Sequence, residues 1–121
     1  MADDKPIVDI PEALSRAMGD IDFLKMMLDE LQGVMPEFVA RLQKAIQQDD
    51  MVTLGSAAHQ LKGSAANLGA KAIAAAALEL ERIGKSGASK GGMQAIERLE
   101  VAVEEFKHHL TQIDWSSVHP E

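Results

Sequence analysis

Apolar residues recur at intervals of three and four along four long stretches of the chain, which is the spacing of amphipathic helices. The stretch 51–68 shows the pattern most clearly, and its apolar stripe consists of Leu54, Ala58, Leu61, Ala65 and Leu68. The other three stretches run from Asp20 to Asp49, over 71–83 and over 93–113. Four such helices with short connections predict an all-α, antiparallel up-down four-helix bundle.

Two prolines and a glycine refine this outline. Asp9 and Glu12 form a capping box around Pro11, and Gly19 is a natural helix end, so the sequence predicts a short additional N-terminal helix over 10–18. Its apolar residues, Met18 among them, suit a lid over one end of the bundle.

Pro36 lies inside the second long stretch, where it removes one backbone hydrogen bond. The apolar pattern keeps its phase across Pro36, which favours one kinked helix over two. The glycine-rich run 84–92 is predicted to be the longest loop. The chain therefore divides into a flexible tail over 1–8, one bundle domain over 9–113 and a C-terminal tail over 114–121, in which Trp115 could pack on the bundle.

Composition narrows the possible partners. The 121 residues carry 12 basic and 19 acidic side chains, a formal net charge of −7, so the basic surface of a nucleic-acid-binding protein is missing. No apolar run approaches the length of a membrane span, and the first residues do not resemble a signal peptide. No cysteine is present, which fits a reducing compartment. We expect a cytoplasmic, monomeric protein that binds neither nucleic acid nor membrane.

His59 is the candidate functional residue, because it lies off the apolar stripe of the stretch 51–68. Its neighbours one helical turn away, or two, are mostly very small: Gly55, Ser56, Lys62, Gly63 and Ala66. Glycine inside a helix costs roughly 1 kcal/mol relative to alanine, so the two glycines near His59 indicate a purpose other than stability. The pattern predicts an imidazole that another protein can approach closely.

The motif His59-x-Leu61-Lys62-Gly63-Ser64, followed by Asn67-x-Gly69, resembles the core of the histidine phosphotransfer (HPt) domains of bacterial phosphorelays. The resemblance implies that His59 carries a phosphoryl group to and from aspartates of response-regulator receiver domains, such as those of hybrid sensor kinases. It also implies that Lys62 steadies the phosphoryl oxygens and that Gly63 leaves room for the partner.

The remaining residues of the motif face carry weaker expectations. Gln60 and Ser64 join Gly55, Ser56, Gly63 and Ala66 as candidate partner contacts, although Ser64 could instead bond to its own helix. Glu105 and His108 form one Glu-x-x-His pattern, whereas a di-iron bundle needs two, so no metal site is expected.

The sequence holds no nucleotide-binding loop and no carboxylate cluster for Mg²⁺, which indicates a phosphoryl carrier without kinase machinery of its own. No cofactor is expected in this chain, and Mg²⁺ would come from the receiver domain. The alternative function is a non-covalent helical adaptor that docks a partner through the His59 face. Such a surface normally has large aromatic or arginine anchors, which are missing here.

Overall fold

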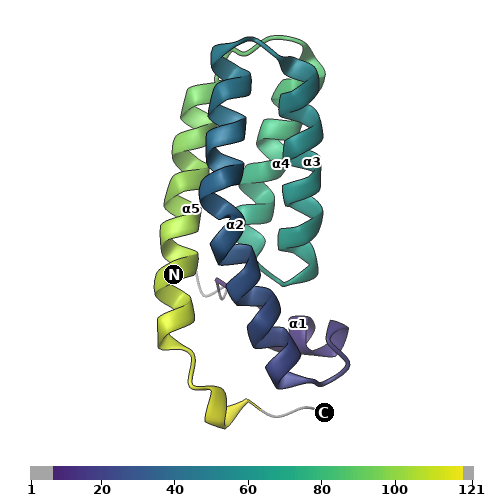
Figure 1. Ribbon diagram of the computed structural model, residues 1–121, viewed down its shortest axis with the longest axis vertical. Coiled ribbons are helices and arrows are strands. Elements are labelled where there is room, and N and C mark those ends of the chain that lie inside the picture. The colour runs from purple at the N-terminus through teal and green to yellow at the C-terminus, as the bar shows by residue number, and fades with distance from the viewer. Residues whose placement is uncertain (1–6, 119–121) are drawn as a thin grey trace, which may run out of the picture.

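The structure, a computed structural model, describes residues 7–118 and is helical throughout (Figure 1). Its elements are α1 (Ile10–Arg16), α2 (Ile21–Gln47), α3 (Met51–Asn67), α4 (Lys71–Ser86), α5 (Gly92–Gln112) and a 3-10 turn, η1 (Trp115–Ser117). The predicted all-α four-helix bundle with a short N-terminal helix is confirmed.

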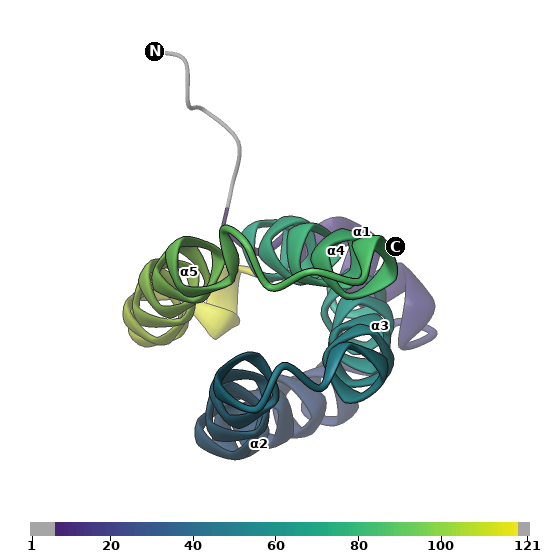
Figure 2. The ribbon, with the colours of Figure 1, turned by 90° about the horizontal axis from the view of Figure 1, so that it is seen from above.

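The four long helices follow one another around the bundle axis, as the view along that axis shows (Figure 2). Each packs against two neighbours, and α3 and α4 make the most extensive contact. The predicted stripe of α3 lies entirely inside the core: Leu54, Ala58, Leu61, Ala65 and Leu68 are all buried. Because that stripe is buried, the opposite side of α3 is presented outward.

Aspartate side chains cap the first turns of α1, α2 and α3. Asp20 accepts a hydrogen bond from the backbone N–H of Phe23 at 3.0 Å, and Asp50 accepts one from Thr53 at 3.1 Å. Each satisfies an N–H that the first turn of a helix leaves without a partner. Pro36 lies within an unbroken α2, which confirms one helix rather than two.

Two helix ends differ from the prediction. The helix α1 ends at Arg16, and Met18 adopts a positive φ of 58° with 92% of its surface exposed, so it is a turn residue and not part of the lid. The helix α4 continues to Ser86 and stops where Gly87 takes a φ of 80°. The predicted loop is therefore reduced to residues 87–91, and Gly84 belongs to a helix.

The N-terminal boundary also shifts, because Val8 is buried and pairs with Ala70 in an isolated antiparallel bridge. Most of the expected tail, residues 1–6, lies outside the described residues, as do residues 119–121. The helix α1 lies beneath the end of α3 (Figure 1), where Arg16 donates hydrogen bonds to the carbonyls of Ala66 and Asn67. The segment from Val8 to Arg16 is thus tied to the bundle.

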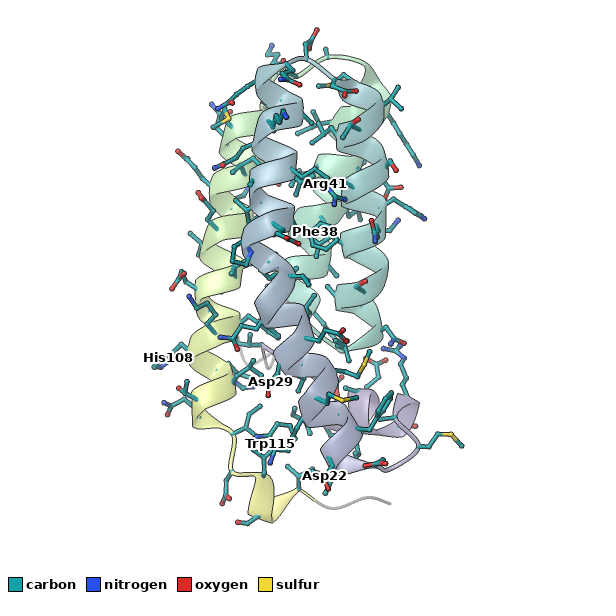
Figure 3. The ribbon with its side chains drawn as sticks, in the orientation of Figure 1. Asp22, Asp29, Phe38, Arg41, His108 and Trp115 are labelled. Atoms are coloured by element: carbon teal, nitrogen blue, oxygen red, sulfur yellow. The ribbon has the colours of Figure 1, made fainter. Side chains whose placement is uncertain are left out.

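At the other end, Trp115 is partly buried against the core, as the sequence suggested. The ammonium of Lys25 lies 5.7 Å from the centre of its ring, within the range of a cation–π contact. Figure 3 shows Trp115 between the lower ends of α2 and α5.

Candidate functional site

His59 projects from the outer side of α3, with 68% of its side chain exposed to solvent. Helix α3 holds it there because the two residues that precede it, Ala57 and Ala58, turn into the core. The predicted exposure of this imidazole is confirmed. Its outer edge is open to a reacting partner.

A carboxylate that the sequence analysis did not identify lies behind the ring. Glu81 of α4 is 3% exposed, the one charged residue among the described residues to be buried. Its Oε2 lies 2.8 Å from Nδ1 of His59, which is a hydrogen-bonding distance. The site is therefore built by two helices and not by α3 alone.

Two lysines converge on the same carboxylate. Nζ of Lys62 lies 2.6 Å from Oε1 of Glu81, and Nζ of Lys85, one turn further along α4, lies 3.4 Å from Oε2. Oε1 has no well-aligned hydrogen bond, so its contact with Lys62 is an ion pair at close range. Together these groups compensate a carboxylate that would otherwise be buried alone.

The ion pairs keep Glu81 ionised. The contact with Lys62 has the largest effect and, with smaller contributions from His59 and Lys85, lowers the pKa of Glu81 to about 2 although burial acts in the opposite direction. An ionised carboxylate can only accept hydrogen bonds, so Nδ1 of His59 must carry the proton. In the neutral ring, Nε2 then keeps a free lone pair on the exposed side.

Glycines bring α3 and α4 close enough for these contacts. A methyl group added at Gly84 would lie 2.6 Å from the backbone N and 2.7 Å from the Cα of Gly55. Gly55 is half buried against α4 and does not lie on an open face as the sequence analysis expected. The close approach of the helices requires glycine at position 84, whereas a methyl group added at Gly55 would meet its nearest atoms, in the backbone of Gly84, at 3.9 Å, an ordinary contact distance.

The other residues expected around His59 do lie on the solvent-exposed side of α3. Exposed are Ser56, Gln60, Gly63, Ser64 and Ala66. A methyl group added at Gly63 would meet nothing within 4 Å, so packing does not explain this glycine. The exposed surface of α3 around His59 therefore consists mostly of small residues and leaves room for a partner.

The position of Glu81 on the apolar stripe of α4 could have been recognised from the sequence. It lies four residues after Ala77 and eight after Ile73, both of which occupy the buried side of α4. A carboxylate on an otherwise apolar stripe needs a compensating partner, and the neighbouring helix supplies Lys62. Which residue of the neighbouring helix would face it depends on how α3 and α4 pack, which periodicity alone does not determine.

The described residues contain no group of three or more histidine, aspartate or glutamate side chains close enough to hold a metal ion. Figure 3 shows His108 on the outer side of α5, pointing away from the bundle. The single Glu-x-x-His pattern of Glu105 and His108 therefore does not face the core. None of the described helices is long and apolar enough to cross a membrane.

The sequence over residues 22–114 matches the Hpt domain family. This match spans most of the chain, and the chain belongs to the Hpt domain family, the histidine phosphotransfer domains of phosphorelays. The expectation drawn from the motif around His59 is confirmed at the level of the family. The purely non-covalent adaptor is not favoured.

Solved structures share the fold. Histidine-containing phosphotransfer protein B (HptB) from Pseudomonas aeruginosa PAO1 superposes with a TM-score of 0.81 at 24% identity, over 94% of this chain and 98% of that one. The HPT domain of an Hpt sensor hybrid histidine kinase from Shewanella gives a TM-score of 0.69 at 22% identity, over 89% and 97% of the two chains. No curated protein matches the sequence significantly.

Proposed function

We propose that His59 is the phosphoacceptor of this Hpt domain and that it carries the phosphoryl group on Nε2. The observation that supports this most strongly is the hydrogen bond of Nδ1 to the ionised Glu81, because it assigns the proton of the neutral ring to Nδ1 and leaves the lone pair on Nε2, in a side chain that is 68% exposed. Nε2 is then the nucleophilic atom of an otherwise ordinary surface histidine.

The transfer step requires no proton movement at the ring. The Nε2 lone pair attacks phosphorus of an aspartyl phosphate, the bond from phosphorus to the aspartate oxygen breaks, and the carboxylate leaves with the electron pair. The phosphorylated ring retains its Nδ1 proton and is positively charged. Glu81 stabilises that developing charge from 2.8 Å away, and the reverse reaction returns the phosphoryl group to an aspartate.

The two lysines are placed to serve both states. Without phosphate, they neutralise Glu81. Phosphoryl oxygens on Nε2 would carry nearly two negative charges, and the ammonium groups can move toward them because lysine is a flexible point charge. In this proposal Lys62 holds the phosphoryl group, and Lys85 adds positive charge to the same site.

The partner in this proposal is a receiver domain whose phosphorylated aspartate approaches over Gly63 and the exposed serines of α3. The receiver domain would also provide Mg²⁺, and this chain acts as a monomeric carrier without kinase activity. The direct test is to mix the protein with a panel of phosphorylated receiver domains. Transfer should produce an acid-labile, alkali-stable phosphoryl group, whereas an acid-stable product would exclude phosphohistidine.

Replacing Lys62 by alanine should slow transfer about 10- to 100-fold, because a charge-assisted contact to the phosphoryl oxygens is lost. Single-turnover transfer from a phosphorylated receiver measures this rate. Lys71→Ala is the matched control, since Lys71 lies at the start of α4 with partners in Asp9 and Glu12. If Lys62→Ala transfers at the wild-type rate, Lys62 stabilises only Glu81.

Replacing Glu81 by glutamine separates the charge of this residue from its hydrogen bond. The amide oxygen can still accept from Nδ1, so the tautomer is retained while the negative charge is lost. We expect transfer about tenfold slower. A rate equal to that of the wild type would show that the charge of Glu81 plays no part in transfer.

The same variant predicts a pH dependence of stability. The pKa of Glu81 is about 2 in the folded protein against an ordinary value of 4.5, so ionised Glu81 stabilises the fold above pH 4.5. This contribution disappears as the pH falls from 4.5 toward 2. Urea unfolding at several pH values should show the stability of the wild type converging on that of Glu81→Gln across this window.

Replacement of Gly63 by a larger residue should increase the stability of the fold and slow transfer from the receiver. Gly63→Ala is expected to stabilise the protein by up to about 1 kcal/mol, since its methyl group meets open space. Gly63→Gln should keep most of that gain while slowing transfer about tenfold or more, because its side chain covers the approach to His59. Melting temperature and transfer rate are measured on one preparation; unhindered transfer would place the partner on another face.

A further inference from the structure

A groove of about 620 Å³ lies between α2 and α5. These two helices stand on the far side of the bundle from the seam of α3 and α4 that holds His59 (Figure 2). A partner in the groove would therefore not cover the phosphotransfer site. Its use is independent of the function proposed for His59.

The floor of the groove is apolar and its edges are acidic. Met35, Val39 and Val103 contribute apolar surface, while Asp29, Glu100 and Glu104 contribute three carboxylates. Among the described residues that line it, the one cation is Lys107, whose Nζ lies 3.6 Å from Glu104. The lining thus has a net negative charge around an apolar strip.

On the α2 side the groove is shallowly bounded by Gly33 and Pro36, two residue types that a helix interior disfavours. A side chain at Gly33 would meet nothing within 4 Å, and both Gly33 and Pro36 are exposed. Glycine costs about 1 kcal/mol there and proline about 3 kcal/mol relative to alanine. Pro36 also has no N–H to donate to the carbonyl of Gln32, which lines the groove. Close packing therefore does not explain why position 33 is a glycine.

The shape is that of a site for a helix. The α2 side runs from Asp29 to Gln43, about 21 Å at 1.5 Å per residue, or roughly four helical turns. The opposite side of the groove, on α5, includes Glu100, Glu104 and Lys107. An amphipathic helix places apolar side chains on the floor at spacings of three and four and its charges on the rim.

We propose that this groove, hereafter the α2–α5 groove, binds a basic amphipathic helix of a partner protein. Lysine or arginine side chains on that helix would pair with the carboxylates of Asp29, Glu100 and Glu104. A second copy of this chain is a poorer occupant, because each copy carries a net charge of −7. The groove would thereby hold the domain on a basic partner while a receiver reaches His59.

The probe is a synthetic helical peptide of about 18 residues with leucine on one face and lysine on the other. Titrated into ¹⁵N-labelled protein, it should give saturable amide shifts at Gly33, Ala40 and Val103. The same peptide with glutamate in place of lysine should give none. Shifts centred on α3, shifts spread evenly over the acidic surface, or equal binding of both peptides would overturn the proposal.

Variants test the site without relying on the peptide alone. Glu104→Lys should weaken binding about fivefold or more, whereas Glu105→Lys makes the same charge change next to it on the α4 side of α5 and should have little effect. Gly33→Leu should fill the groove, abolish binding and leave stability and receiver transfer intact. Equal effects of Glu104→Lys and Glu105→Lys would contradict a specific site, as would concentration-dependent dimerisation that Gly33→Leu removes.

Discussion

His59→Gln should reduce phosphoryl acceptance from a phosphorylated receiver to the background level. Glutamine has no nucleophilic ring nitrogen, so the covalent intermediate cannot form at this position. Its amide can still donate to Glu81, and Lys62 and Lys85 remain beside that carboxylate. The melting temperature should therefore change by less than about 3 °C, as is usual for an exposed site.

Other histidines provide the control for this experiment. His108→Gln and His109→Gln should transfer at the wild-type rate, because both residues lie on α5, away from Glu81 and the lysines. Labelling that persists in His59→Gln and disappears in one of these variants would show that the site is on α5.

Gly84→Ala should destabilise the bundle by about 1–3 kcal/mol, the range for overpacking at a close contact. The atoms that its methyl group would meet, at 2.6 to 3.0 Å, all belong to the backbone of Gly55 and Met51, so no flexible side chain can move aside. The helices α3 and α4 must then separate. We expect a melting temperature lower by about 10 °C and a longer distance from His59 to Glu81.

The matched change is Gly63→Ala, which adds the same methyl group on α3 where nothing lies within 4 Å. One variant should therefore lower the melting temperature and the other raise it. Gly84→Ala should also slow transfer, because the contact of Nδ1 with Glu81 depends on the crossing of the two helices. If both variants raise the melting temperature, α3 and α4 are not in close contact at Gly84.

Most of the fold could be predicted from the sequence, because the helices are amphipathic and side chains next to α1, α2 and α3 cap their starts. Asp20 and Asp50 cap α2 and α3 through their side chains, and the stripe of α3 is buried as expected. The end of α4 was misplaced because its glycine has a packing role. At Gly84 the residue type suggested a loop, whereas contact with Gly55 favours glycine within a helix.

Only the part of the site that lies on α3 could be predicted from the sequence. His59, Lys62 and Gly63 lie within one continuous motif, so helical geometry alone brings them together. Glu81 is 22 residues further along the chain and reaches His59 only through the packing of α3 on α4. Contacts between helices depend on their crossing and rotation, which periodicity does not specify.

The most direct measurement is a long-range ¹H–¹⁵N NMR spectrum of the protein, labelled in its histidine rings, after transfer from a phosphorylated receiver. The proposal predicts one phosphohistidine, at position 59, with phosphorus bonded to Nε2 and a proton on Nδ1. Phosphorylation of Nδ1, or of any other residue, would contradict the role assigned to His59 and Glu81.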